Sequence, residues 1–578
     1  MMLTVLMSMV GIRIFAHDYA VENTDGKTIY YNNIGGSNVS VTFKGYGGEY
    51  FYSGNIVIPE SIIVGGNTYN VTSIGREAFY ECSGLTSVTI PNSVTSIGYG
   101  AFKSCTGLTF IEIPNSVTTI GEEAFWYCPG LISIEIPNSV TSIGREAFRG
   151  CSGLTTITIP NSVTTIGYDA FVGTAWYNNQ PNGLVYAGKV AYKYKGTMPA
   201  NTSLTIEDGT LGIACQAFEN CSGLTSIEIP NSVTTICWDA FYGTTWYNNQ
   251  PNGLVYAGKV AYQYKGTMPA NTNITIEDGT LGIADIAFYN CTGLTSIEIP
   301  NSVTNIGENA FDGCSGLTSI EIPNSVTSIG HDAFYHCSGL TSIIFDNCRP
   351  TLSDDVFCLC SNLTDIYYPA YAYDYFTSNA QTSVYTLHPQ IKIDREWTTY
   401  CASASFDVPE GIDAYVVNSY DAGVVTLQKV TTINAGQGLL LKPAEVGTFY
   451  NTTVCASAPD PYESNMLKGV TTATAIGATS GEYTNFIFTK VNGELGFYPT
   501  NAGTIPAYKA YLQIPTASLP SGAPSRLSIA IDDETTSVER VKTNTGKDSN
   551  WYTLSGVQAK QPTKSGVYIH QGKKVIIK

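Results

Sequence analysis

The sequence predicts a repeat solenoid with a parallel β ladder and short helical turns, followed by a β-sandwich and a small C-terminal β module. Three observations support this fold class. Phenylalanine, cysteine and proline recur every 23 residues over the first half of the chain, for example at Phe79, Phe102 and Phe125. A repeat period in the low twenties is typical of a solenoid. From His388 the chain changes to alternating runs punctuated by Gly and Pro, and it ends on a lysine-rich run.

The composition excludes several classes of protein. The chain has 578 residues, of which 43% are hydrophobic, and this is ample for packed domains. Its 29 basic and 47 acidic residues give a net charge of −18. A chain without a basic stripe has nothing to neutralise a phosphate backbone, so we expect no nucleic-acid partner. After the N-terminus no apolar run reaches the length of a membrane span, so we expect no membrane span.

Residues 1–16 are typical of a signal peptide. Their apolar run of about twelve residues is too short to cross a bilayer and suits the apolar region of such a signal, with cleavage after Ala16. No Lys or Arg precedes the run, which points to a late start codon or a degenerate signal, and a buried first strand is the alternative. We expect an exported protein at the cell surface or outside the cell.

Each repeat contains a strand with strict alternation. Glu298 stands between two isoleucines, so the isoleucines face the core and Glu298 faces outward. Pro300 lacks the N–H group that a ladder needs and therefore lies just outside the strand. Val303 and Ile306 predict a second short inward-facing segment, and the apolar residues of 310–314 share one face of a predicted helical turn.

Such units must stack, because one unit buries too few apolar groups to offset the entropy of ordering its backbone. Stacked coils share apolar layers and complete a parallel ladder. The glycine after the isoleucine, as in Gly75, is replaced by Cys237 and Ala284 in other units. We therefore expect this slot to require a small residue rather than a positive φ.

Nine of the 15 cysteines occupy one slot of the repeat. Equivalent side chains on stacked coils point in parallel, and this disfavours the dihedral angle of a disulfide. We expect buried, reduced thiols that pack as small apolar groups.

The pattern Ile-Gly-x-x-Ala-Phe-x-x-Cys-x-x-Leu-x-x-Ile-x-Ile-Pro resembles the BspA-type leucine-rich repeat over roughly residues 56–367. The resemblance implies a surface-exposed or secreted bacterial protein, and some members of the family act as adhesins for host matrix proteins or other cells. We expect an N-terminal β cap at residues 17–55 and the leucine-rich repeat solenoid at residues 56–387.

Two long units interrupt the period, at residues 173–217 and 243–287. Residues 184–194 alternate around an Ala-Gly pair and predict a hairpin. Each insertion begins with a Trp-Tyr pair that could form an aromatic platform for a glycan or a host protein. The alternative is that the pair covers the core where the regular coil is interrupted. The pairs are Trp176 with Tyr177 and Trp246 with Tyr247.

The outward strand positions form ladders of Ser, Thr and Glu. Like charges on neighbouring strands are mildly destabilising, so glutamates in a column could mark a site for a cation or a basic partner, or simply a well-solvated sheet. Phe110 interrupts this face and is a further candidate contact. The glutamates are Glu112 beside Glu135 and Glu298 beside Glu321.

No motif in the sequence predicts a reaction. His331, Asp332, His336 and Cys337 look like a metal cluster, but the i, i+5 spacing of the histidines misses the one-face geometry of helical ligands, and other units hold unrelated residues at these slots. We expect no catalytic residue, no cofactor and no metal.

Residues 388–531 contain alternating runs at sandwich-like intervals. Cys401 and Cys455 are the only cysteines of this part and could pair. Trp397-Thr-Thr-Tyr400 and residues 507–511 resemble β domains found in surface proteins of Bacteroides-like bacteria.

Residues 532–549 are polar and predict a linker. Residues 550–578, with five Lys and no acidic residue from Trp551 onward, resemble the C-terminal sorting domains of type IX secretion in Bacteroidota. The resemblance implies that export machinery binds the tail, and it places Gly556, Gly566 and Gly572 at turns. The alternative is a small hairpin module without a sorting role.

The sequence thus predicts a non-catalytic recognition or adhesion protein that is secreted or displayed on the cell surface. Its solenoid would bind a host matrix protein, another cell, including another bacterial surface, or a glycan. The alternative is a secreted accessory protein that binds polysaccharide for nutrient capture.

Overall fold

The computed structural model describes most of residues 17–532 and the backbone of four strands between residues 551 and 577. The predicted signal peptide and nearly all of the predicted linker lie outside the described residues. Within residues 17–532 the description omits 24, 44–51, 354, 380, 456–461, 463, 492–493, 501 and 520–523.

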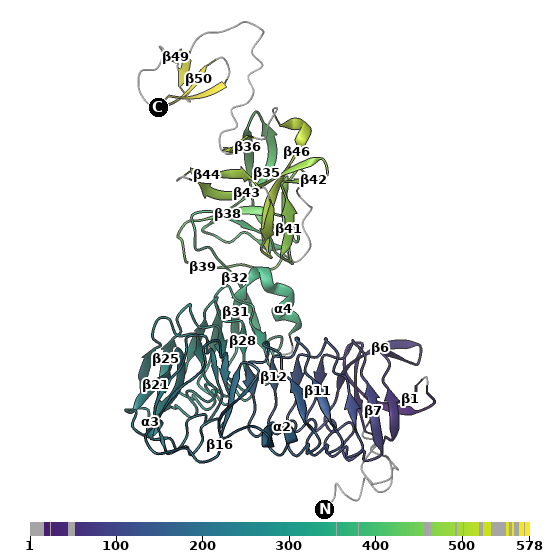
Figure 1. Cartoon of the computed structure of the whole chain (residues 1–578). Helices are drawn as coiled ribbons and strands as arrows, with labels where there is room; N and C mark the ends of the chain where they lie inside the picture. Colours follow the sequence, from purple (N-terminus) through teal and green to yellow (C-terminus); the bar gives the residue numbers. More distant parts are fainter. Residues whose placement is uncertain are drawn as a thin grey trace, which may run out of the picture.

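Each regular coil of the solenoid places two short strands in two parallel ladders, which run side by side along the molecule (Figure 1). The first ladder is built from the Ile-x-Ile segments, and Pro300 follows its strand as predicted. Its strands are β4 (Gly54–Val57), β7 (Leu85–Thr89), β9 (Phe110–Ile111), β11 (Ser133–Glu135), β13 (Thr156–Thr158), β17 (Thr202–Thr205), β19 (Leu224–Glu228), β23 (Thr272–Thr275), β25 (Leu294–Glu298), β27 (Ser319–Ile322), β29 (Ser342–Phe345) and β31 (Asp365–Pro369).

The second ladder is the predicted second inward segment, in which Val303 and Ile306 are buried. An antiparallel cap of β1 (Tyr19–Glu22), β2 (Thr28–Gly35) and β3 (Asn38–Thr42) joins this ladder through parallel pairing of β3 with β6, and β5 (Ser61–Val64) pairs with β6. The remaining strands are β6 (Asn67–Ile74), β8 (Ser96–Ile97), β10 (Thr119–Ile120), β12 (Ser142–Ile143), β14 (Thr165–Ile166), β18 (Gly212–Ile213), β20 (Thr235–Ile236), β24 (Gly282–Ile283), β26 (Asn305–Ile306), β28 (Ser328–Ile329) and β30 (Thr351–Leu352).

Both insertions contain the predicted hairpin. After a one-turn helix, the hairpin's second strand pairs in parallel with the next solenoid strand and so re-enters the second ladder. The first insertion holds α2 (Ala175–Asn178), β15 (Gly183–Ala187) and β16 (Val190–Lys195), and the second holds α3 (Thr245–Asn248), β21 (Gly253–Ala257) and β22 (Val260–Lys265).

The predicted helical turn of each unit is wrong, because the segment is a run of turns bonded to the next coil. In the unit that starts at Gly75, the Phe79 N–H donates to the Ala101 carbonyl at 2.7 Å. In an α-helix that same N–H would donate to the residue four positions back. Glu77 and Glu81 have φ of 55° and 56°, which breaks the helical path. The stacking bonds therefore replace the local helix.

Stacked phenylalanines form the centre of the solenoid. The rings of Phe79, Phe102 and Phe125 lie nearly parallel, with centroids 5.0 and 5.1 Å apart. The repeat cysteines lie beside this column as free thiols, and all but Cys221 are buried, which confirms the prediction of reduced cysteines. The Cys105 Sγ donates to the Phe79 carbonyl at 2.9 Å, and burial raises the pKa of that thiol.

The small-residue requirement at the glycine slot is confirmed. Gly98 and Gly121 do not have a left-handed φ, but a Cβ on Gly121 would stand 2.7 Å from the backbone carbon of Gly98. Real Cβ atoms do not approach backbone so closely, so close stacking of the coils selects glycine here.

Beyond the solenoid, two sheets share one buried cluster that includes Val417, Leu427, Phe486 and Leu512. Cys401 and Cys455 are free, so the predicted pairing is wrong. The first sheet has β33 (Thr398–Tyr400), β38 (Leu439–Pro443), β35 (Ile412–Asp421), β36 (Val424–Val430) and β47 (Ser528–Asp532), and the second has β40 (Leu467–Val470), β46 (Lys509–Pro515), β43 (Tyr483–Val491), β42 (Thr479–Ser480) and β44 (Glu494–Pro499). Two small pairs are β34 (Phe406–Asp407) with β37 (Thr432–Ile433) and β41 (Thr474–Gly477) with β45 (Ala502–Ile505).

The solenoid passes directly into this second part (Figure 1). β32 (Thr386–Lys392) pairs in parallel with β31 and antiparallel with β39 (Phe449–Asn451), so a solenoid sheet continues across residue 388. Arg349 donates to the Tyr508 hydroxyl at 2.9 Å and joins the two parts a second time. Helical residues here are η1 (Ala370–Ala372) and α4 (Tyr373–Ser378), and η2 (Thr516–Ser518) follows β46.

The tail forms an antiparallel sheet in the order β49-β48-β50-β51. Gly566 begins β50, while Gly556 and Gly572 lie outside the described residues. Within the described part of the chain, no helix is both long enough and apolar enough to cross a membrane. The strands are β48 (Trp551–Thr553), β49 (Gln558–Ala559), β50 (Gly566–His570) and β51 (Lys573–Ile577).

Candidate binding surfaces

The aromatic pair of each insertion packs on the core and keeps only part of its surface in solvent. Thr174 caps α2 by accepting a hydrogen bond from the Tyr177 N–H at 3.0 Å. This turn sets the Trp176 ring edge-on against Phe171, with centroids 5.3 Å apart, and the Tyr177 ring lies at 5.8 Å from Tyr192. Such packing is what a cover for the interrupted coil requires.

The second insertion repeats this arrangement. Trp246 lies 4.8 Å from Phe241 and Tyr247 lies 5.7 Å from Tyr262, measured between ring centroids. A lysine holds each helix in place: Lys265 donates to the carbonyls of Tyr247, Asn248 and Gln250. The two platforms are therefore equivalent in structure, and each indole is only partly exposed.

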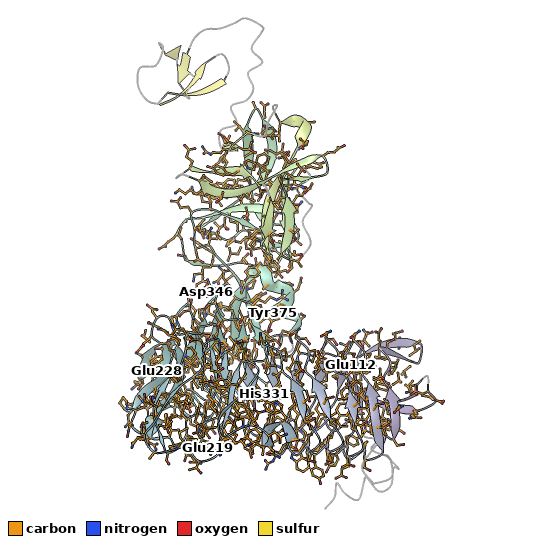
Figure 2. All side chains as sticks on the ribbon, viewed as in Figure 1. Glu112, Glu219, Glu228, His331, Asp346 and Tyr375 are labelled. Carbon is orange, nitrogen blue, oxygen red and sulfur yellow. A yellow bond between two sulfur atoms is a disulfide. The ribbon has the colours of Figure 1, made fainter. Side chains whose placement is uncertain are left out.

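The predicted glutamates are all exposed. They fall into two separate pairs, because Glu112 and Glu135 belong to the N-terminal coils, where Figure 2 labels Glu112, and Glu298 and Glu321 to the C-terminal coils. The Glu298 carboxylate accepts a hydrogen bond from Thr275 at 3.0 Å. Burial and the neighbouring Asp346 raise the pKa of Glu321. The structure thus offers two local acidic spots and no continuous acidic strip among the residues it describes.

Phe110 is 57% exposed and has an apolar neighbour that the sequence interpretation missed. Ile132, which is 58% exposed, occupies the adjacent slot on the next coil. The neighbouring units hold Thr109 and Thr155 at the slot of Ile132. An apolar residue where the repeat has threonine could have identified Ile132 from the sequence. Neither side chain contributes to the core, and the two exposed side chains, which stand on neighbouring coils, are called the apolar patch below.

Exposed tyrosines on the turn face were missed as well. Tyr80, Tyr242 and Tyr289 each follow a phenylalanine of the buried column and are themselves exposed. Because all three tyrosines occupy the same position of the repeat, a comparison of the units could have found them. Amphipathic aromatics of this kind supply contact area at low entropic cost.

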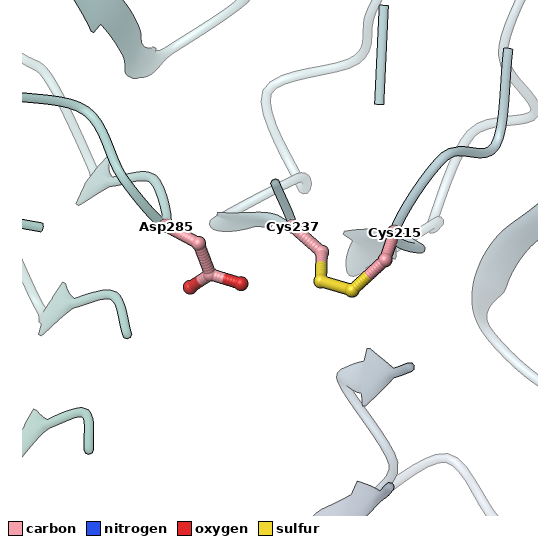
Figure 3. A group of neighbouring side chains, drawn as sticks. All are labelled: Cys215, Cys237 and Asp285. Carbon is pink, nitrogen blue, oxygen red and sulfur yellow. A yellow bond between two sulfur atoms is a disulfide. The ribbon is translucent and has the colours of Figure 1, made fainter. Parts of the chain in front are cut away.

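A buried group forms from the ends of both insertions and the coil between them (Figure 3). Cys215 and Cys237 form a disulfide with their Cα atoms 4.5 Å apart, and the Asp285 carboxylate lies beside them. Cys237 stands in the glycine slot, and Cys215 and Asp285 share the slot that follows it. The bonded sulfurs are not thiolates, which are the form that ligates metals, so this group acts as a crosslink between coils.

Asp285 is a buried acid without a cationic partner among the described residues. Its Oδ1 accepts a hydrogen bond from the Glu308 N–H at 2.8 Å. Burial, and then the charge of Glu308, raise the pKa of Asp285 to about 8. The carboxyl group is therefore neutral in the folded protein at pH 7.

The sequence's metal-like group is not brought together. His336 faces Asp312, with its Nδ1 3.8 Å from Oδ1, and Cys337 is buried in the cysteine column. His331 instead lies 2.9 Å from Asp332 and near Asp355. These three are the donors that the structure gathers, and they lie at a partly exposed surface.

The sequence profile described as BspA type leucine rich repeat region matches residues 68–180, 189–265 and 260–388. These segments together span more than half of the chain. No curated protein matches the chain.

Three solved structures match part of the chain. A leucine-rich repeat protein from Bacteroides ovatus is 24% identical, and the match covers 64% of this chain and 100% of the other at a TM-score of 0.24. A leucine rich cell surface protein from Faecalibacterium prausnitzii is 25% identical, and the match covers 61% of this chain and 95% of the other at a TM-score of 0.24. A leucine-rich repeat protein from Bacteroides capillosus is 30% identical, and the match covers 24% of this chain and 98% of the other at a TM-score of 0.21.

The profile matches the stacked coils described above, and it is a repeat region rather than a catalytic family. The chain therefore belongs to the BspA-type leucine-rich repeat family.

Proposed function

We propose that this protein is a non-catalytic recognition or adhesion protein of the cell surface or the extracellular space, and that the solenoid binds its partner. The observation that carries the proposal is the exposed patch of Phe110 and Ile132 on the first ladder. The core uses the residues that recur in every unit, whereas this patch adds two apolar side chains that the fold does not need. Exposed apolar neighbours on a rigid scaffold favour a protein-binding surface.

The partner we propose is a host extracellular protein, or another bacterial surface that presents a protein. Glu112 and Glu135 adjoin the patch and favour a partner with basic residues around an apolar anchor. Glu298 with Glu321 forms a second acidic spot for the same kind of partner. The tyrosine-bearing turn face and the indoles of Trp176 and Trp246, with Tyr177 and Tyr247, are additional contacts.

A panel of matrix proteins and a glycan array test this function with the purified chain. The double variant Phe110→Ser and Ile132→Thr, which restores the residues of a regular unit, should weaken binding at least tenfold. Ile63→Thr removes a similarly exposed side chain from β5, away from the patch in the sequence, and serves as the matched control. Binding to glycans alone, unchanged in the double variant, would instead favour the polysaccharide-binding alternative.

Trp176→Ala and Trp246→Ala separate the two interpretations of the insertions. If the indoles are ligand platforms, binding falls while the melting temperature holds. If they cover the core, as their edge-on packing against Phe171 and Phe241 favours, the melting temperature falls by several degrees.

We also propose the predicted domain boundaries, with the two sheets of residues 388–531 as a β-sandwich module that spaces the solenoid from the tail. For residues 550–578 we propose a sorting role in type IX secretion by a member of the Bacteroidota. Deletion of these residues in the producing cell tests this, and unchanged surface display would leave the tail as a structural hairpin module.

A further inference from the structure

A cavity of about 560 Å³ lies where the last coils of the solenoid meet the second part of the molecule, with Asn347 of the solenoid in its wall. The rest of its wall combines the segment from the end of β32 into β33 with parts of β41, β43, β45 and β46. The residues that matter here are Arg395, Trp397, Thr398, Phe488 and Lys509. This volume is within the range of small-molecule sites, which is roughly 300 to 1,000 Å³.

The cavity carries an excess of positive charge in a chain of net charge −18. Lys392, Arg395 and Lys509 line it, against the single carboxylate of Asp394. Lys392 already forms an ion pair with Asp346 at 2.7 Å. Among the described residues no carboxylate lies within ion-pair distance of Arg395 or Lys509.

Lys509 is the more constrained of the two remaining cations. Its Nζ donates to the Thr398 Oγ1 at 3.1 Å, which leaves two of its three N–H groups for other partners. Burial, and then the nearby charge of Arg395, lower the pKa of Lys509. An anion between the two side chains would relieve the repulsion and regain the lost solvation.

The rest of the wall suits a sugar ring. Trp397 borders the cavity, and its ring is held by Tyr415 and Phe488 at centroid distances of 5.4 and 6.4 Å. The Lys442 ammonium lies 5.6 Å from the centroid of the indole, and the part of the indole that lines the cavity is an apolar surface for the C–H groups of a pyranose. Five threonines line the same cavity and provide hydroxyl donors and acceptors for sugar hydroxyls: Thr398, Thr399, Thr489, Thr500 and Thr504.

We propose that this cavity binds a carboxylate-bearing saccharide, a uronic acid or a terminal uronate of a longer glycan. Lys509 and Arg395 hold the carboxylate, Trp397 contacts the ring and the threonines bond its hydroxyls. The cavity adjoins the solenoid near Glu321, whose carboxylate lies 4.0 Å from the Lys392 ammonium, but the proposed ligand does not rest on the function proposed for the solenoid.

Titration calorimetry of the full chain with three probes tests the proposal. D-glucuronate carries the ring and the charge, D-glucose the ring alone, and acetate the charge alone. We expect glucuronate to bind at least tenfold more tightly than either of the others. Arg395→Gln and Lys509→Gln should each weaken glucuronate binding about tenfold, as expected for the loss of one charge-assisted hydrogen bond.

The matched control is Lys468→Gln, which removes an exposed lysine of the same domain outside the cavity and should bind glucuronate like the parent chain. Arg395 is exposed, so Arg395→Gln should keep the parent's melting curve even if Lys509→Gln does not fold. Glucuronate binding no tighter than glucose or acetate would overturn the proposal, and so would unchanged affinity in Arg395→Gln and Lys509→Gln. Short oligomers of hyaluronan and of galacturonate then distinguish a host-matrix source from a plant source, and either one binding supports the site.

Discussion

Replacing Asp285 by asparagine should change how the stability of the solenoid depends on pH. The buried carboxyl has its pKa raised from 3.8 to about 8 in the folded protein. Between these values the folded chain keeps a proton that the unfolded chain has lost. Stability therefore falls as pH rises through this window, by about 1.4 kcal/mol per pH unit. An asparagine side chain cannot ionise, so the Asp285→Asn variant lacks this contribution, while its amide oxygen can still accept the hydrogen bond from the Glu308 N–H.

The magnitude follows from the same two values. From pH 5 to pH 7 the free energy of unfolding of Asp285→Asn should gain about 3 kcal/mol relative to the parent chain. Urea unfolding of both chains at pH 5, 6 and 7, with the disulfide intact, measures this difference, and all other titrating groups are common to the two proteins. Asp208→Asn is the control, because Asp208 is exposed in the turn before β18 and its removal should leave the pH profile parallel to that of the parent. Parallel profiles for Asp285→Asn would refute the argument that burial keeps this carboxyl neutral.

Three further predictions concern the packing of the coils. Phe125→Ala should lower the free energy of unfolding by about 3 to 5 kcal/mol, because its ring is fully buried in the phenylalanine column. Phe110→Ala removes an exposed ring and should cost less than about 1 kcal/mol. Equal losses of the two variants in urea unfolding would contradict the assignment of core and surface. Gly121→Ala should lower the melting temperature by several degrees, since its Cβ would collide with the backbone of Gly98, and a calorimetric scan that matches the parent chain would argue against close stacking. Thiol titration of the denatured, unreduced chain should find 13 free cysteines, rising to 15 after reduction; fewer thiols before reduction would mean that cysteines of the column are paired.

Much of the solenoid was predictable because its constraints are local or repeat exactly once per coil. The alternation around Glu298 predicted the strand and its outward face, and Pro300 predicted where the strand ends. The interruptions of the 23-residue period marked the two insertions in which the hairpins were predicted. Comparison of Gly75 with Ala284 gave the size limit of the glycine slot. The strand, its end and the hairpins follow from backbone geometry and side-chain period, which neighbouring residues specify without any distant contact. The size limit comes from stacking between coils and shows in the sequence because the same contact recurs in each unit.

Contacts between coils and between domains needed the tertiary structure. Whether Phe79 donates its hydrogen bond within a turn or to the next coil depends on stacking register, and the helical expectation failed there. The disulfide between Cys215 and Cys237 joins different positions of the repeat on neighbouring coils. A comparison of residues at the same repeat position could therefore not find it. The candidate saccharide cavity brings together Arg395 and Lys509, which are far apart in the sequence. The pattern of neighbouring residues carries no information about the distance between Arg395 and Lys509, because the path of the chain through the fold brings them together.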